Sequence, residues 1–288
     1  MPEYAVALGT FDGLHSGHIA VLQNILNKGL TPLVLTFDSP PKINKRSNLI
    51  MTPEDKISVL EVLGAKVEVM DFNKVKDMSP IDFLSFVVDK HSPKIIATGY
   101  DFRFGKGAEG DTKTLYDFCE ARGIEYKCTD AVLMDGKPVS STAIREAISA
   151  GDIKKANTML NNYFSFAGKV RHGDERGRTI GFPTVNIAYP TELVVPKFGV
   201  YASFTEFRGE IYKSVTYIGV RPTFKTDFVI SETNIIGFAS DVYRKKIRIH
   251  LVDFIRGETA FAGLEELKAA ISNDKKMAEL LLNNASMY

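Results

Sequence analysis

The stretch Gly9-Thr10-Phe11-Asp12-Gly13-Leu14-His15-Ser16-Gly17-His18 decides how the first half of the chain folds. It follows the apolar run Ala5–Leu8 and precedes a segment in which Ile19, Leu22 and Ile25 fall on one helical face. The pattern predicts a strand, a tight glycine turn and the start of a helix. Glycine lets the backbone approach a ligand closely, and the unpaired N–H groups of a helix start favour anions.

The two histidines of this stretch indicate which anion is bound. His15 and His18 are three residues apart and can donate ring N–H bonds to phosphate oxygens, which stabilises charge that builds during in-line displacement. The alternative is a glycine-rich turn with two surface histidines. We favour a phosphate site suited to nucleotidyl transfer from ATP, for which the stretch itself does not indicate the acceptor. The residues expected to contact ATP beside the histidines are Gly9, Thr10, Phe11, Asp12 and Gly17.

The rest of the first half alternates between strands and helices. The apolar runs 33–37 and 94–98 suit strands buried on both faces. Thr52-Pro53 and Ser79-Pro80 each offer an N-cap followed by proline at the first helical position. Alternation of this kind predicts a parallel sheet that binds ligands beyond the carboxyl ends of its strands.

From Tyr163 onward the pattern changes to short strands that follow one another. We expect strands at 163–170, 184–187, 199–204, 211–218, 233–238 and 246–254. Such a series indicates an antiparallel barrel or sandwich, against which a helix at 264–282 would pack. We place the domain boundary so that residues 1–158 form the first domain and 159–288 the second.

Bulk composition excludes several classes of protein. The 288 residues carry a net charge of +1, and no basic stripe suggests a nucleic-acid partner. No run approaches the roughly 20 apolar residues that cross a bilayer, and Met1–Tyr4 lacks the basic region of a leader. Two cysteines without metal-ligand companions suit a reducing compartment. We expect a cytoplasmic protein without membrane or nucleic-acid partners; its oligomeric state stays open.

A second polar segment, Val139–Arg145, supports a phosphate site. Ser140 or Ser141 would cap a helix, Thr142 offers a hydroxyl, and the planar guanidinium of Arg145 suits phosphates. By itself the segment reads as an ordinary helix start with an exposed arginine. Together with the first stretch it predicts that Ser141, Thr142 and Arg145 take part in ATP binding and transfer.

In these two segments the chain resembles the bacterial bifunctional riboflavin kinase and FAD synthetase family. The resemblance rests on His15-Ser16-Gly17-His18, on Ser141-Thr142-Ala143-Ile144-Arg145 and on the intervening Gly99–Gly105. It implies a Rossmann-like α/β nucleotidylyltransferase domain that joins FMN and ATP into FAD and pyrophosphate, with Mg²⁺. Asp101 and Phe104 would contact the flavin. The chain has Thr36–Pro41 where the family usually has Pro-His-Pro.

The second half resembles the riboflavin kinase module of the same family. The matching segments are 168–173 and 176–186, with Gly-Phe-Pro-Thr-x-Asn at 181–186. The resemblance implies an antiparallel β-barrel with a terminal helix. Thr184 and Asn186, two apart on one strand, would offer two neutral oxygens to Mg²⁺, although a Thr-x-Asn pair alone is usually a surface pair. The expected phosphate contacts are Gly168, Lys169, Arg178 and Gly181, and the expected flavin contacts are Phe182 and Pro183.

Further segments, 219–224, 241–247 and 256–261, extend this match. Glu232 aligns with the acidic residue that the family uses as the base on a ribityl hydroxyl of riboflavin. Three positions differ from the family pattern: Asn234 replaces a histidine, Gly237 an aspartate and Arg244 a glycine.

Three functions fit these observations. The first is a bifunctional enzyme that phosphorylates riboflavin to FMN and adenylylates FMN to FAD. The second is an FAD synthetase whose kinase-like barrel has degraded into a flavin-binding appendage. The third is a non-catalytic flavin- or RNA-binding regulator, against which the near-neutral charge argues. We favour the first.

Overall fold

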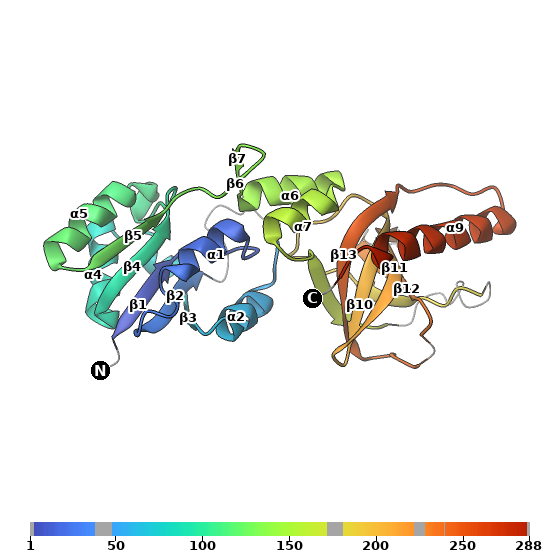
Figure 1. The fold of residues 1–288 in the computed structure, drawn as a ribbon, viewed down its shortest axis with the longest axis horizontal. Helices are drawn as coiled ribbons and strands as arrows, with labels where there is room; N and C mark the ends of the chain where they lie inside the picture. Colours follow the sequence, from blue (N-terminus) through green and yellow to red (C-terminus); the bar gives the residue numbers. More distant parts are fainter. Residues whose placement is uncertain (1–2, 38–47, 172–180, 222–227, 239, 287–288) are drawn as a thin grey trace. The chain divides into compact units, whose positions relative to one another are not determined.

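The computed structural model describes residues 3–37, 48–171, 181–221, 228–238 and 240–286. The chain divides into two compact units, Met1–Ser141 and Thr142–Tyr288 (Figure 1). Among the described helices, none combines the length and the apolar content that crossing a bilayer requires.

The first unit is built on a parallel sheet with the strand order β3-β2-β1-β4-β5. The strands are β1 (Tyr4–Leu8), β2 (Thr31–Phe37), β3 (Lys66–Met70), β4 (Pro93–Gly99) and β5 (Glu125–Thr129). The order reverses between β1 and β4, because β2 and β3 lie on one side of β1 while β4 and β5 lie on the other. The carboxyl end of β1 is therefore the topological switch point, where open α/β sheets bind their ligands.

Helices cover both faces of this sheet. On one face, Phe83 and Leu115 lie in the core with Val6 and Ile96, and on the other Leu22 lies with the alternate residues of the strands. The helices and short elements of the unit are α1 (Ser16–Gln23), α2 (Pro53–Val62), α3 (Phe72–Val75), α4 (Pro80–His91), the 3-10 turn η1 (Lys106–Ala108), α5 (Thr112–Arg122) and the small hairpin β6 (Leu133–Met134) and β7 (Lys137–Pro138).

Local sequence signals account for where two of these helices begin. The side chain of Thr52 accepts from the backbone N–H of Asp55 at the start of α2, and Ser79 caps α4 in the same way. Each has proline at the first helical position, so the missing N–H costs nothing there. The parallel α/β prediction is confirmed.

The second unit begins within the helix α6 (Ser141–Ala150), whose first residue belongs to the first unit, and it includes the helix α7 (Ile153–Leu160). It continues into a six-stranded antiparallel sheet with the order β8-β13-β10-β11-β12-β9. Its strands are β8 (Ser165–Lys169), β9 (Val185–Ala188), β10 (Gly199–Phe207), β11 (Glu210–Arg221), β12 (Phe228–Ile235) and β13 (Lys246–Arg256). A bridge between Arg171 and Asn186 brings the two edges together, so the sheet is a nearly closed barrel. The barrel prediction is confirmed.

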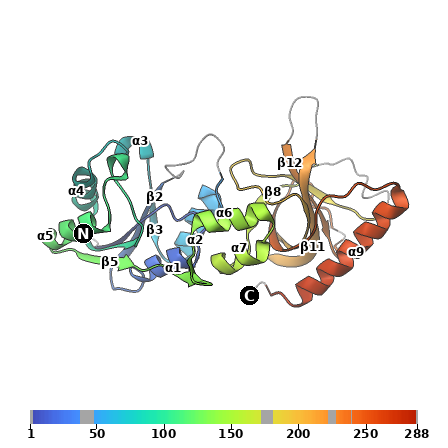
Figure 2. The same cartoon turned by 90° about the horizontal axis from the view of Figure 1, so that it is seen from above.

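The terminal helix α9 (Leu264–Asn283) packs along the outside of the barrel, as Figure 2 shows. Ala278 and Leu282 of α9 form an apolar cluster with Ala202 and Phe204 of β10. The inside of the wall is unusually polar: six hydroxyl side chains without solvent exposure form a connected hydrogen-bond network. They are Ser203, Thr205, Ser214, Thr216, Ser231 and Thr233. Because each hydroxyl has a partner, this polar interior carries little desolvation cost.

One expected strand is misplaced. The sequence predicts 233–238, whereas β12 runs from Phe228 to Ile235. The strand ends there because the chain turns at Gly237, whose φ is +72°. The apolar residues beyond Ile235 belong to that turn, in which Phe238 donates its N–H to the Ile235 carbonyl.

An ion pair between the half-buried Arg256 and the buried Asp274 holds α9 to the end of β13. Arg256 donates from Nε to Oδ1 of Asp274 at 2.8 Å and from Nη2 to Oδ2 at 2.7 Å, and Asp274 is only 3% exposed. We expect Asp274→Ala to destabilise the barrel by about 2–3 kcal/mol, because it leaves the guanidinium without its bidentate partner. Urea denaturation measures this. Glu265→Ala, which removes an exposed pair with Lys268 on the same helix, should not move the transition; an equal shift in both variants would contradict the assigned role of the pair.

Candidate active site

The stretch between β1 and α1 is a tightly held loop at the switch point of the parallel sheet. Phe11 (φ +51°) and Leu14 (φ +44°) both adopt left-handed backbone conformations that are costly for residues other than glycine. A Cβ on Gly9 would lie 3.0 Å from the Phe11 ring, and one on Gly13 would lie 2.9 Å from Ile50. A side chain at position 9 would press on the Phe11 ring, and Gly13, with a φ of +86°, has both a glycine conformation and no room for a Cβ.

The rings of His15 and His18 stack on each other at the start of α1. Their centroids are 3.7 Å apart with an interplanar angle of 20°, and the Phe11 ring packs edge-on against His18 at 5.3 Å. A Cβ on Gly17 would lie 3.2 Å from the His15 ring, which explains the glycine between them. Nδ1 of His18 is buried without a hydrogen-bond partner among the described residues. Ring packing therefore positions this imidazole.

The electrostatic surroundings keep His18 neutral in the free protein. Burial of the ring lowers the pKa of His18 well below its ordinary value, and the positive charges of His15 and Lys56 lower it further. The charged neighbours that act on His18 among the described residues are both cations, so a bound phosphate would supply negative charge that favours the protonated ring.

This depressed pKa predicts how the stability of the first unit changes with pH. Because the unfolded chain binds a proton at His18 more readily than the folded chain, the stabilising contribution of neutral His18 is present above about pH 6.5 and is lost as pH falls towards the folded-state pKa. We expect the thermal midpoint to fall between pH 7 and pH 5, and His18→Asn to reduce the slope. Identical slopes in both proteins would contradict the depressed pKa.

The second motif reaches the same loop through Ser141. Its hydroxyl donates to the Asp12 carbonyl at 2.9 Å, and the carboxylate of Asp12 accepts the N–H of Ile50 at 2.9 Å. Ser141 is also the first residue of α6, so Ser140 occupies the cap position. Thr142 is exposed and Arg145 half-buried on the first turns of α6, in the second compact unit.

The segment expected to contact flavin lies after β4. Asp101 is exposed in the turn that follows the strand. Phe104 is 6% exposed and packs against Phe83 and Phe102, with ring centroids at 5.8 and 5.5 Å. A Cβ on Gly110 would lie 2.7 Å from the Phe104 ring. Phe104 thus belongs to the core of the first unit, and its role as a flavin contact stays a prediction.

In the second unit, the register of the barrel brings two of the expected kinase residues together. Glu232 of β12 pairs directly with Asn186 of β9, so their side chains lie on one face of the wall. Thr184 precedes the first residue of β9 and is exposed. A hydroxyl, an amide and a carboxylate therefore occur within a short stretch of the wall. These oxygens suit Mg²⁺, which takes one or two protein ligands and completes its shell with water and phosphate.

Sequence reasoning missed Tyr217 and the role of Asn234 at this site. Tyr217 is the partner of Glu232 on its other side, in β11, and donates to Glu258 at 2.7 Å. Burial raises the pKa of Tyr217, and Glu258 and Glu232 raise it further, so the phenol stays protonated. Asn234 donates its amide to the Pro183 carbonyl at 2.7 Å and ties the Thr184 segment to β12. The alternation of residues along β11 shows which of its side chains share a face. Only the pairing of β11 with β12 shows that Tyr217 lies beside Glu232.

The other residues expected to contact phosphate or flavin lie at different places in the second unit. Gly168 lies in β8 where a Cβ would come within 2.0 Å of Ile187, so packing alone requires this glycine. Lys169 ends β8 and is exposed, and the N–H of Arg171 donates to the Asn186 carbonyl at 2.8 Å. Gly181 has a φ of +87°, Phe182 is half-buried and Pro183 exposed. Arg178 lies outside the described residues.

Two of the positions that differ from the family pattern have a conformational explanation. Arg244 has a left-handed backbone with φ +60°, the region that glycine adopts without cost, and its guanidinium lies over the Tyr243 ring at 5.3 Å. Gly237 has φ +72° in the turn after β12. Arg244 thus occupies a place suited to glycine at a modest cost in strain.

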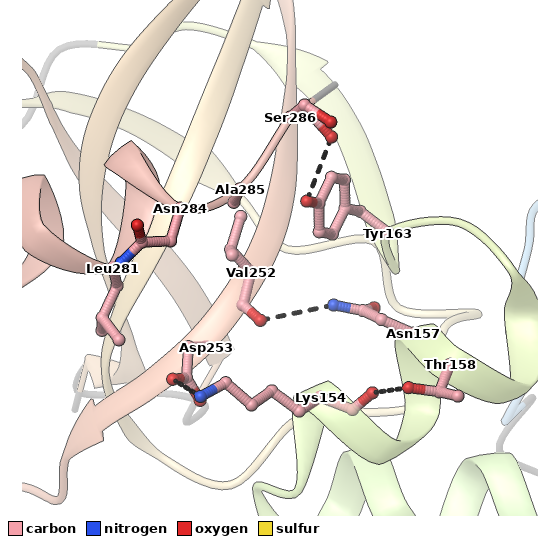
Figure 3. A pocket seen from close by; sticks show the side chains of 10 residues that line it. All are labelled: Lys154, Asn157, Thr158, Tyr163, Val252, Asp253, Leu281, Asn284, Ala285 and Ser286. Carbon is pink, nitrogen blue, oxygen red and sulfur yellow. Dashed lines mark hydrogen bonds and ion pairs between the residues drawn. The ribbon is translucent and has the colours of Figure 1, made fainter. Parts of the chain in front are cut away.

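A hollow of about 620 Å³ lies elsewhere in the second unit, where α7, β13 and the end of α9 meet (Figure 3). Lys154 pairs with Asp253 at 2.8 Å, Asn157 donates to the Leu251 and Val252 carbonyls, and Tyr163 donates to the Ser286 carbonyl. Because these lining groups satisfy one another, the hollow reads as a structural junction of three elements.

The fold and its sites define a class of protein: a nucleotide-handling parallel-sheet domain followed by a barrel with its own oxygen-rich site. The model of the FAD synthetase family matches residues 1–143, and that of the riboflavin kinase family matches residues 160–282. The chain belongs to the family of bifunctional riboflavin kinase/FMN adenylyltransferases.

Three comparisons show the extent of this similarity. The bifunctional riboflavin kinase/FMN adenylyltransferase of Bacillus subtilis is 37% identical, over 97% of this chain and 92% of its own length. That of Escherichia coli is 34% identical over 95% and 91%. A crystal structure described as a macrolide-efflux protein from Streptococcus pneumoniae superposes with a TM-score of 0.89 at 27% identity, covering 99% of this chain and 96% of that one.

Proposed function

We propose that this chain converts riboflavin to FMN and FMN to FAD, with ATP as the co-substrate of both reactions. The observation that carries the proposal is the presence, in one chain, of the His15/His18 loop at a parallel-sheet switch point and of the Asn186–Glu232 pair on a barrel wall. Similarity over nearly the full length to bifunctional relatives supports both activities and favours them over a synthetase with a degraded barrel.

We assign FAD formation to residues 1–158. A phosphate oxygen of FMN attacks the α-phosphorus of ATP, the bond to the bridging oxygen of the β-phosphate breaks, and pyrophosphate leaves. The protein has little covalent work to do, so alignment and charge stabilisation dominate. His15 and His18 would donate to the phosphates, and the N–H groups at the start of α1 would add to this. Ser141, Thr142 and Arg145 would hold the triphosphate.

We assign FMN formation to residues 159–288. Glu232 would accept the proton of the ribityl hydroxyl as that oxygen attacks the γ-phosphorus of ATP and ADP leaves. Thr184 and Asn186 would hold Mg²⁺, whose chemistry is to neutralise phosphate charge. The direct pairing of Asn186 with Glu232 supports this assignment, because it places a candidate metal ligand beside the candidate base.

The cellular setting is also a proposal. Cys119 is buried and Cys128 exposed, and both are free thiols. A pair of unlinked thiols suits the reducing cytoplasm.

The experiment that tests the proposed function is a time course with riboflavin, ATP and Mg²⁺, in which the flavins are separated by chromatography. We expect FMN to appear first and FAD to follow, and a chelator in excess over Mg²⁺ to stop both. Formation of FAD from supplied FMN, with no product from riboflavin, would show that the chain is a synthetase alone.

A further inference from the structure

Lys56 is a buried cation that contacts the backbone of the loop carrying the two histidines. It lies in the first turns of α2, is 6% exposed, and belongs to no motif that the sequence analysis identified. Its position is unfavourable on two counts: burial strips the ammonium of water, and the N-terminal end of a helix dipole repels a cation. Specific contacts must compensate for these costs.

Among the described residues, three oxygen atoms accept hydrogen bonds from the ammonium group. Lys56 Nζ donates to the Phe37 carbonyl at 2.7 Å, to the Thr10 carbonyl at 3.0 Å and to the Thr36 hydroxyl at 3.0 Å. Thr36, which has no solvent exposure, donates its own hydroxyl to the Thr10 carbonyl at 3.0 Å. The lysine therefore joins the carboxyl end of β2 to the residues that follow β1, and two donors meet at one carbonyl.

The Thr10 carbonyl belongs to the peptide unit that leads into Phe11. Fixing that carbonyl fixes the plane of the peptide, and with it the torsion at Phe11, whose φ of +51° is costly and persists only where its surroundings enforce it. The Phe11 ring in turn packs against His18, whose position depends on ring contacts. A chain of contacts thus runs from Lys56 through Thr10 and Phe11 to His18.

We propose that Lys56 is a positioning residue for adenylyl transfer, acting through the Thr10 carbonyl and the left-handed Phe11 to hold the His18 ring in place. This inference rests on the proposed function of the His15/His18 loop. Lys56 contacts the loop's backbone rather than a substrate, and its charge, together with that of His15, also acts on the titration of His18.

The test replaces Lys56 by methionine in the full-length chain, because methionine keeps much of the length and apolar bulk without the charge. We expect kcat/KM for FAD formation from FMN to fall about 100-fold, as misplacement of a catalytic group by about 1 Å would produce. Riboflavin phosphorylation should stay within twofold of wild type. Lys113→Met, which removes an exposed cation from α5 in the same unit, is the matched control and should leave both rates unchanged.

A second variant keeps the test decisive if Lys56→Met fails to fold. Thr36→Val preserves size and the charge of Lys56 but removes one donor to the Thr10 carbonyl and one acceptor of Lys56. We expect about a tenfold loss of FAD formation, because the variant loses two buried hydrogen bonds but keeps the bond from Lys56 to the Thr10 carbonyl. Wild-type FAD formation in a folded Lys56→Met would overturn the inference; if Lys56→Met does not fold, wild-type FAD formation in Thr36→Val would do so. Equal loss of FMN formation would overturn it as well.

Histidine NMR separates positioning from a general loss of structure. In Lys56→Met the ring signals of His18 should shift because the stacked ring loses its fixed position, while the signals of His91 and His250 stay in place. His18 ring signals identical to those of the wild type would overturn the inference. If Lys56→Met retains activity while His18→Ala loses it, this inference alone fails; if His18→Ala also retains FAD formation, the proposed function of the loop fails.

Discussion

His18→Ala should lower kcat/KM for FAD formation from FMN by about 10²–10³-fold, the loss that follows removal of one donor to developing charge. The His18 ring is held between Phe11 and His15 at the start of α1, at the switch point of the parallel sheet. Burial is the main cause of its lowered pKa, so the imidazole is neutral in the free protein. Bound phosphates would bring negative charge that favours the protonated ring and strengthens its attraction to them.

The same substitution should leave FMN formation from riboflavin within twofold of wild type, because His18 belongs to the first compact unit and Glu232 to the second. His91→Ala removes another histidine of the first unit, one whose neighbours are Glu68 and Tyr4, and is the matched control. Equal loss of both activities in His18→Ala would refute the separation of the two sites.

Glu232→Gln should lower the rate of riboflavin phosphorylation by about 10²–10⁴-fold, the range associated with loss of a general base. Glutamine keeps the shape of the side chain and its pairing opposite Asn186, but it has no carboxylate to take the ribityl proton. FAD formation from supplied FMN should be unaffected. Steady-state rates with riboflavin and with FMN, measured separately, give the comparison.

The control for this variant is Glu258→Gln on the neighbouring segment. Glu258 accepts the Tyr217 hydroxyl, a bond that glutamine can also accept, so its replacement should cost far less. If Glu258→Gln were the more damaging of the two, the base would have to be reassigned from Glu232 to Glu258.

Much of the fold can be predicted from the sequence, because the buried strands are recognisable as apolar runs. β1, β2 and β4 are apolar runs in the middle of the sheet, and the caps at Thr52 and Ser79 mark two helices. The edge strands β3 and β5 are not predicted from the sequence, because charged and apolar residues alternate along these half-buried strands, as in Lys66–Met70. Their place depends on partners that local sequence does not specify.

The candidate sites likewise combine residues that the sequence predicts with contacts that it does not. The glycines and histidines of the loop predict a phosphate site from the sequence. The left-handed conformation of Phe11 and the hydrogen bond from Lys56 to the Thr10 carbonyl cannot be predicted in this way, because both depend on contacts between distant segments. Likewise, the motif at 181–186 identifies Thr184 and Asn186. The pairing of Asn186 with Glu232, and of Glu232 with Tyr217, follows only from the register of the barrel strands.

We propose that this one chain holds two independent sites that act in sequence. The most direct measurement gives the His18→Ala variant riboflavin, ATP and Mg²⁺ and follows its flavins over time. We predict that FMN accumulates at the wild-type rate while FAD stays near the detection limit. Formation of FAD at the wild-type rate, or no accumulation of FMN, would contradict the claim.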